Sequence, residues 1–170
     1  MASKGTKPAY WDEAVEHLKA NDRILNKIIQ QYEGEYFAAT TQGAFSTLAR
    51  SLISVQSSEA RANQVWRNLV QLCGQQPTVQ CISARTVEQL LAIGIAKRKA
   101  GNLIDLANHF EARTVNPKKW SKMSDQEVIN ELCQIRGIGA WTAQMFLIFN
   151  LHRPNICLLY TSDAADDPLR

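Results

Sequence analysis

Apolar residues recur along most of this chain at the three- and four-residue spacing that places them on one face of an α-helix. No stretch alternates between polar and apolar residues with the period of two that a half-buried strand requires. The pattern therefore predicts an all-α fold. The predicted helices span residues 10–20, 22–31, 44–55, 59–72, 86–93, 96–112, 124–135 and 140–151. Polar or proline-containing connections are predicted at 33–42, 75–83 and 113–122.

Residues 132–151 combine a glycine turn with the helices on either side of it. The sequence R-G-I-G at 136–139 predicts a tight turn, because glycine adopts positive φ without steric cost. Upstream, Ser124 and Glu127 have the spacing of a capping box, which begins the helix that leads into the turn. The predicted structure is a helix, a glycine hairpin and a second helix.

Such a hairpin can bind an anion through the free N–H groups and the positive dipole end of its second helix. The plainer interpretation is a helix–helix turn whose glycines serve only the bend. The turn sequence alone does not distinguish these two interpretations.

Composition and charge permit several classes of soluble protein. The 170 residues are 45% hydrophobic and 21% charged, with a formal net charge of +3. This mild basic excess allows nucleic-acid binding without demonstrating it. Basic residues concentrate in the segments 97–99 and 113–122, which are interpreted either as solvated surface or as a rim facing phosphates.

The cysteines indicate neither a metal centre nor a disulfide framework. Their spacing is irregular, without a C-x-x-C pair, at Cys73, Cys81, Cys133 and Cys157. We therefore expect reduced thiols in an intracellular protein, with no zinc site and no iron–sulfur cluster. No apolar run is long enough to span a bilayer, so no membrane partner is expected.

Three segments in order resemble one family. The hairpin segment reads L-x-x-I-R-G-I-G-A-W-T-A-Q-M-F-L-I-F-N-L-x-R-P at 132–154. The two upstream segments read F-S-T-L-A-R-S-L-I-S-V-Q-S-S at 45–58 and L-L-A-I-G-I-A-K-R-K-A-G-N-L-I-D-L-A at 90–107. Residues 10–156 thereby resemble the helix–hairpin–helix DNA glycosylases, within them the 3-methyladenine glycosylase II type. The resemblance implies two helical lobes with double-stranded DNA bound across the cleft between them.

The resemblance also implies roles for individual positions. A monovalent cation, Na⁺ or K⁺, would be held by the main-chain carbonyls of Cys133, Ile135 and Gly137. The DNA contacts would come from Arg136, Gly137, Ile138, Gly139 and Thr142. Gln56 falls where the family inserts a side chain into the gap left by an extruded base. A loop glutamine bonded to nearby backbone is an equally good interpretation of Gln56.

Trp141 narrows the implied chemistry. Relatives that also cut the DNA strand carry a lysine at this position, whose amine forms a Schiff base with the sugar. Tryptophan has no nucleophile, so base release without strand cleavage is implied, and the indole can stack on a flipped, cationic base. Trp141 could also be a core residue. Met145 and Phe45 are further candidates for the base pocket, although core packing explains each of them better.

The end of the chain departs from the family pattern. The family's catalytic aspartate follows Arg-Pro-Asn/Asp by a few residues, in a stretch like L-P-x-D-D-x-G. Here Leu158 stands in place of the proline, and Tyr160 and Thr161 stand in place of the acidic pair. The segment C-L-L-Y-T-S-D-A-A-D-D instead resembles a translated sequencing adapter. We therefore expect 157–170 to be a non-native tail, with the family's C-terminal helices missing. The tail aspartates, Asp163, Asp166 and Asp167, receive no catalytic role.

These expectations combine into one hypothesis with two rivals. The parent protein is expected to be a monomeric, monofunctional DNA glycosylase that excises alkylated purines in base-excision repair, without a required cofactor. It would act in the nucleoid of a bacterium or the nucleus of a eukaryote. Residues 1–9 are expected to be disordered, 10–156 to form an incomplete glycosylase domain, and the fragment to be inactive. The alternatives are a non-catalytic DNA-binding hairpin module and a glycosylase for another damaged base.

Overall fold

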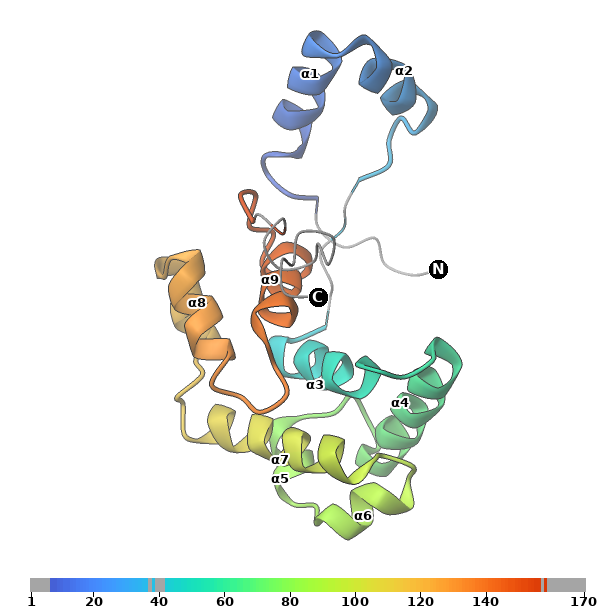
Figure 1. The fold of residues 1–170 in the computed structure, drawn as a ribbon, viewed down its shortest axis with the longest axis vertical. Coiled ribbons are helices and arrows are strands. Elements are labelled where there is room, and N and C mark those ends of the chain that lie inside the picture. Colours follow the sequence, from blue (N-terminus) through green and yellow to red (C-terminus); the bar gives the residue numbers. More distant parts are fainter. Residues whose placement is uncertain (1–6, 37, 39–41, 157, 159–170) are drawn as a thin grey trace, which may run out of the picture.

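A computed structural model describes residues 7–36, 38, 42–156 and 158 (Figure 1). Every regular element in this described part is a helix, which confirms the all-α prediction. The elements are α1 (Trp11–Asn21), α2 (Arg23–Gln31), α3 (Ala44–Ser54), α4 (Glu59–Cys73), α5 (Val79–Ser83), α6 (Val87–Ala92), α7 (Lys97–Glu111), the 3₁₀-helix η1 (Pro117–Lys122), α8 (Asp125–Leu132) and α9 (Ala140–Phe149). None of the described helices is both long and apolar enough to cross a membrane.

Helix starts follow the capping signals of the sequence. The side chain of Asp22 accepts hydrogen bonds from the first N–H groups of α2. Ser58 does the same for α4. Complete capping boxes begin α6 at Thr86 and α8 at Ser124, with Gln89 and Glu127 as the reciprocal partners. These side chains satisfy N–H groups that a helix leaves without internal partners, which explains why the starts were predictable.

One hydrophobic core unites α3 to α9, and α7 lies at its centre. The buried face of α7 consists of Ala100, Leu103, Leu106 and Ala107. It packs against α3, α5 and α6. In Figure 1, α3, α5, α6 and α7 lie together at one end of the molecule, and α9 lies between this group and the pair α1 and α2. Helix α7 therefore connects the segments on which the candidate site depends.

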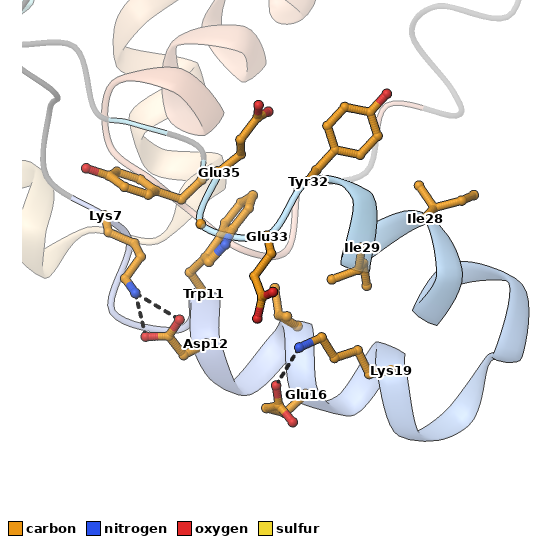
Figure 2. Close-up of a pocket in the computed structure, with 13 residues that line it drawn as sticks. Lys7, Trp11, Asp12, Glu16, Lys19, Ile28, Ile29, Tyr32, Glu33 and Glu35 are labelled. Carbon is orange, nitrogen blue, oxygen red and sulfur yellow. Dashed lines mark hydrogen bonds and ion pairs between the residues drawn. The ribbon is translucent and has the colours of Figure 1, made fainter.

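The helix pair α1 and α2 stands apart from that core. Neither helix contains a buried residue. Several large apolar side chains on the pair are exposed: Leu18, Ile24, Ile28 and Tyr32. A cavity of about 550 Å³ lies between the two helices and residues 32–36, and Trp11, Ile28 and Ile29 are among the residues that line it (Figure 2). This pair thus presents several large apolar side chains to solvent.

The two ends of the chain lie largely outside the described residues. Residues 1–6 of the expected disordered segment are not described, nor are 157 and 159–170 of the expected tail. Residues 7–9, in contrast, are placed. The Lys7 ammonium bonds both carboxylate oxygens of Asp12, at 2.8 and 2.7 Å, and Pro8 is buried.

Two predicted connections contain short helices. Thr78 caps α5, within the predicted loop 75–83, and the side chain of Ile82 is fully buried. In the predicted loop 113–122, η1 places Trp120 in the core, where its indole N–H donates to Glu131 at 2.7 Å. Both elements are too short to show a helical period in the sequence, which is why periodicity alone missed them.

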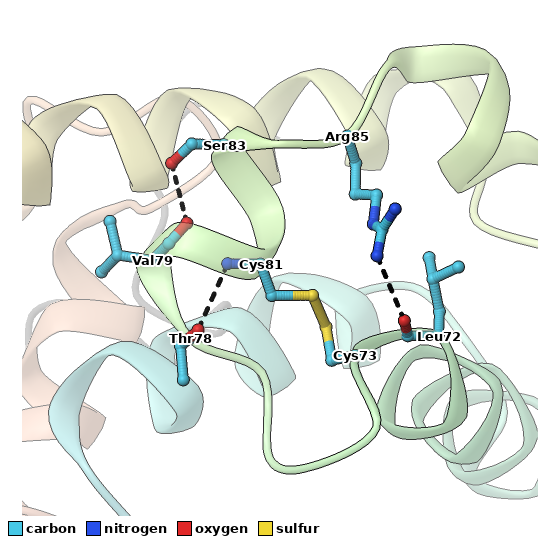
Figure 3. Close-up of a disulfide and its surroundings, with 7 residues drawn as sticks. All are labelled: Leu72, Cys73, Thr78, Val79, Cys81, Ser83 and Arg85. Carbon is cyan, nitrogen blue, oxygen red and sulfur yellow. Dashed lines mark hydrogen bonds between the residues drawn. A yellow bond between two sulfur atoms is a disulfide. The ribbon is translucent and has the colours of Figure 1, made fainter.

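The expectation of reduced thiols is wrong for one pair of cysteines. Cys73, at the end of α4, and Cys81, in α5, form a disulfide with a Cα–Cα distance of 5.8 Å (Figure 3). Gly74 adopts the left-handed conformation (φ 68°) directly after Cys73, which reverses the chain and returns α5 to the end of α4. Cys133 is a free thiol.

Candidate nucleic-acid interface

Two isoleucines hold the hairpin between α8 and α9 in the core. Ile135 and Ile138 are 1% and 4% exposed, and the N–H of Ile138 donates to the carbonyl of Ile135 at 3.1 Å. Between them, Gly137 adopts a φ of +88°, a conformation that strains any residue with a side chain. The apolar residues of the turn thus face the core and its main chain reverses direction within three residues.

The two glycines of the hairpin serve different purposes. A Cβ at Gly137 would overlap the side-chain amide of Asn102 on α7 and lie 3.1 Å from Leu52 Cδ2 on α3. At Gly139, which caps α9 with φ −98° and ψ 175°, a Cβ would meet nothing within 4 Å. Gly137 is therefore required for close packing against α7, whereas Gly139 leaves open space beside the main chain.

That open space lies at the N-terminus of α9. Among the residues that the structure describes, no side chain caps this helix. Its first main-chain hydrogen bond runs from the Ala143 N–H to the Gly139 carbonyl, at 3.0 Å. The N–H groups of the preceding turn thus remain available at the positive end of the helix dipole, an arrangement that suits a phosphate.

A carboxylate on α7 fixes the first residue of the hairpin. Asp105 accepts the main-chain N–H of Arg136 and also its Nε–H, each at 2.9 Å. Burial raises the pKa of Asp105, but the two hydrogen bonds and the charge of Arg136, together with His109, outweigh this effect and hold the pKa below its ordinary value. The Arg136 side chain is nevertheless 70% exposed beside the hairpin.

The Gln56 loop lies on the same side of α7 as the hairpin. Gln56 itself is exposed, has a φ of +53°, and accepts a hydrogen bond from Arg98 at 2.9 Å. Arg98 and Gly137 both line one cavity of about 320 Å³, together with Leu52, Val55, Lys99 and Asn102. Arg98 and Lys99 of the basic segment therefore adjoin the hairpin, as the interpretation of a phosphate-facing rim requires.

Lys99 holds the loop that carries Gln56 through two hydrogen bonds. Its ammonium group donates to the carbonyl of Ile53 at 2.6 Å and to the hydroxyl of Ser57 at 2.7 Å. Burial, followed by the charges of Arg98 and Arg61, lowers the pKa of Lys99. Lys99 therefore supports the turn that carries Gln56, and its charge faces protein rather than open solvent.

The candidate pocket residues differ in exposure. Trp141 is 49% exposed in the first turn of α9, next to the free N–H groups. Thr142, which the resemblance assigns to DNA binding, is buried, with only 8% of the residue exposed. Met145 is half-buried. Phe45 is 8% exposed and packs edge-to-face against Phe110 at 5.3 Å between ring centroids, as a core residue does.

The candidate cation site consists of carbonyl oxygens at the end of α8. Within the described part of the chain, no main-chain N–H donates to the carbonyl of Cys133 or Gly137, and Ile135 accepts only from Ile138. Free carbonyls at a helix C-terminus carry negative partial charge and suit a hard monovalent cation. No cluster of histidine, cysteine or carboxylate ligands for a metal occurs among the described residues.

Sequence reasoning missed two residues of this region, Asn102 and Asp105. Both lie in the helix predicted at 96–112, and with Arg98 they have the spacing i, i+4, i+7 that shares one helix face. This polar stripe was visible in the sequence, but nothing there showed that it faces the hairpin.

Comparison with known proteins identifies the family. Residues 49–156 match the HhH-GPD superfamily of base excision DNA repair proteins, and the chain belongs to that family. It is 31% identical to DNA-3-methyladenine glycosylase 1 of Schizosaccharomyces pombe, over 82% of this chain and 62% of that protein. It is 24% identical to the putative DNA-3-methyladenine glycosylase YfjP of Bacillus subtilis, over 86% of this chain and 54% of the relative. The chain thus spans roughly half to three fifths of these relatives.

Solved structures agree with this assignment. A DNA-3-methyladenine glycosidase from Bacillus halodurans superposes with a TM-score of 0.72 and 26% identity, over 82% of this chain and 64% of the other. The S. pombe 3-methyladenine DNA glycosylase Mag1 in complex with abasic DNA superposes with a TM-score of 0.69 and 27% identity, over 83% and 71%. The resemblance inferred from the sequence motifs is confirmed.

Proposed function

We propose that the parent protein is a monofunctional DNA glycosylase that releases alkylated purines, of the 3-methyladenine type, from double-stranded DNA. The observation that carries this proposal is the half-exposed indole of Trp141, in the first turn of a helix whose N-terminus is open to a phosphate. Membership of a base-excision repair family and similarity to proteins named 3-methyladenine glycosylases support it. A repair enzyme of this kind acts as a monomer on the DNA inside the cell.

Each part of the candidate site receives one proposed role in DNA binding. The N–H groups around Gly139 bind a phosphate and fix the duplex without reading its sequence. Gln56 fills the gap left by the extruded base. Trp141 stacks on that base, and the stacking is stronger when alkylation has made the base cationic.

The cation proposal concerns the same hairpin. Na⁺ or K⁺, held by the carbonyls of Cys133, Ile135 and Gly137, would add positive charge beside the phosphate-binding N–H groups. The chain's own residues at the hairpin bind and orient DNA and do not take part in the reaction itself.

Base release itself requires a carboxylate. Hydrolysis of the N-glycosidic bond adds water across the bond through an oxocarbenium-like state, which a carboxylate stabilises. Positions 160 and 161, where the family pattern places the acidic pair, lie outside the described residues. We propose that the 170-residue chain binds DNA but does not release the base, and that the catalytic aspartate belongs to the parent protein.

The test measures release of 3-methyladenine from alkylated duplex by the full-length parent protein and by residues 1–170. We expect release by the parent alone. Release by the 170-residue chain would contradict the assignment of the missing aspartate, and no release by the parent would contradict the enzyme proposal.

Trp141→Ala in the parent protein tests the pocket by comparing the binding of damaged and undamaged duplex. Stacking of a base on an aromatic side chain contributes about 1–3 kcal/mol, so we expect roughly a ten- to hundredfold loss of preference for damaged over undamaged duplex. Phe149→Ala is the matched control, since Phe149 is equally exposed (48%) at the other end of α9. Equal affinity of the wild-type parent for damaged and undamaged duplex would instead favour a non-catalytic DNA-binding module.

A further inference from the structure

Helix α7 carries a stripe of polar side chains toward the candidate DNA-binding segments. Arg98, Asn102 and Asp105 are spaced i, i+4, i+7 and share one face, while the opposite face is buried in the core. Arg98 bonds to Gln56, Asn102 lies against Gly137, and Asp105 bonds to Arg136. One helix thus contacts both segments to which DNA binding has been assigned.

Asp105 is the unexpected member of this stripe. An anionic side chain close to a surface that binds phosphates repels DNA, so electrostatics alone disfavours it there. Its carboxylate is only 16% exposed and is directed at the hairpin, where it accepts two hydrogen bonds from Arg136. A further neighbour, His109, lies 3.7 Å away, between Nε2 and Oδ2. The position of this charge therefore has a structural purpose that outweighs the repulsion.

The two bonds restrain the hairpin where it begins. Arg136 and Asp105 are 31 residues apart in sequence, so the contact ties the turn to a separate, well-packed helix. Gly137 is held next by its close approach to Asn102, and Ile138 by its burial. Three consecutive residues are thus fixed immediately before Gly139, whose N–H begins the phosphate-binding turn.

We propose that Asp105 is a positioning residue for DNA binding: by accepting the main-chain N–H and the Nε–H of Arg136, it holds the hairpin so that the N–H groups around Gly139 face the DNA phosphate. The proposal rests on the proposed function of the hairpin. It also gives Arg136 a second role, as the partner that neutralises Asp105 beside the DNA.

The variant Asp105→Asn separates positioning from simple charge. It raises the formal net charge from +3 to +4, so charge alone predicts tighter DNA binding. An asparagine, however, has one acceptor oxygen, and its NH₂ group would face one of the two donors of Arg136. Positioning therefore predicts weaker binding, by about tenfold for the loss of one charge-assisted hydrogen bond.

The experiment measures binding of the 170-residue chain to fluorescent duplexes, one undamaged and one with a tetrahydrofuran abasic analogue, by anisotropy at fixed salt. Glu59→Gln is the matched control, because Glu59 is exposed in the first turn of α4 and forms no hydrogen bond or ion pair within the described residues. We expect Asp105→Asn to bind about tenfold more weakly, and Glu59→Gln to bind equally or more tightly. Equal or tighter binding by Asp105→Asn would overturn the proposal.

Two further measurements keep the test decisive. Asp105→Glu keeps the charge but shifts the carboxylate by one methylene. Positioning therefore predicts weaker DNA binding, whereas charge repulsion alone predicts no change in affinity. If Asp105→Asn does not fold, affinity retained by Asp105→Glu overturns the proposal.

In the DNA-free chain, amide hydrogen exchange should become faster in Asp105→Asn at residues 136–139 specifically, and unchanged exchange there would refute the restraint. If the wild type binds neither duplex, the proposed function fails. If the wild type binds and Asp105→Asn binds equally well, only the role of Asp105 is refuted.

Discussion

Replacement of Gly137 by alanine tests the packing on which the hairpin depends. The φ of +88° at this residue is unfavourable for any residue with a Cβ. The added methyl group would also overlap the Asn102 side chain, 2.9 Å from its Cγ, and lie 3.1 Å from Leu52 Cδ2. Two independent costs therefore fall on one methyl group.

Both costs can be estimated. The left-handed backbone conformation costs an alanine about 1–2 kcal/mol. Overpacking in a close-packed region costs about 1–3 kcal/mol more. Together they predict that Gly137→Ala lowers the free energy of unfolding by about 2–5 kcal/mol, or the melting temperature by roughly 5–20 °C for a chain of this size.

Gly139→Ala is the matched control for the same chemical change two residues away. Its φ of −98° is open to alanine, and the new Cβ would contact nothing within 4 Å. Only the weaker N-cap preference of alanine remains, at about 0.5–1 kcal/mol. The methyl group would, however, occupy the space beside the N–H groups that we propose to bind a phosphate. We expect about tenfold weaker DNA binding, as for one lost charge-assisted hydrogen bond.

Thermal denaturation followed by far-UV circular dichroism, with anisotropy for DNA binding, separates the two variants. Gly137→Ala should be strongly destabilised, whereas Gly139→Ala should lose little stability but bind DNA more weakly. In the double variant Gly137→Ala/Asn102→Ala, the steric part of the cost should be recovered. A Gly137→Ala protein as stable as the wild type would refute the close approach to α7.

Three other predictions concern the surrounding structure. Reduction of the Cys73–Cys81 disulfide, or Cys81→Ser, should lower the free energy of unfolding by about 2.5 kcal/mol through the entropy of the short closed loop; a melting temperature insensitive to reductant would contradict it. Glu131→Ala should cost about 2–4 kcal/mol in chemical denaturation, because the buried Trp120 indole N–H and a main-chain N–H lose their acceptor, and Glu131→Gln should cost less. The lowered pKa of Asp105 means that its stabilising effect is present above the ordinary aspartate pKa of about 3.9 and is lost only as pH falls through the lower folded value. The main-chain N–H of Arg136, which donates to Asp105, should therefore remain protected from hydrogen exchange when the pH is lowered to 4. Loss of this protection already at pH 5 would contradict the prediction.

Local signals in the sequence predicted most of the helices. The α4 prediction, 59–72, ends one residue short of Cys73, and α3 begins at the predicted Ala44. Capping side chains and apolar periodicity act within a few residues, so a single sequence contains this information. The same holds for the hairpin, because its glycines and the capping box at Ser124 are all local features.

Tertiary contacts account for what was missed. The Cys73–Cys81 bond depends on the direction the chain takes after Gly74, which residue spacing does not specify. Trp120 is buried because Glu131, eleven residues later, supplies an acceptor for its indole N–H. The role of Asp105 depends on a partner 31 residues away. Each is a pairing between separate segments, and no single segment of the sequence carries its signal.

Two distances define the candidate site, one from the hairpin to Trp141 and one from the hairpin to Gln56, and the fold sets each of them in a different way. Gly139 is the N-cap of α9 and Trp141 lies in its first turn, so the distance from the N–H groups proposed to bind a phosphate to the indole is set by local helix geometry, at about 1.5 Å of rise per residue. Gln56 belongs to a different segment, and its distance from the hairpin depends on α7, which bonds to it through Arg98 and to the hairpin through Asp105. In the proposed complex, a base would be extruded toward Trp141 and its gap filled by Gln56 only if both distances match the DNA at once. We therefore expect the polar face of α7 to be as necessary to the proposed site as the glycine turn, because its side chains bond to both the Gln56 loop and the hairpin.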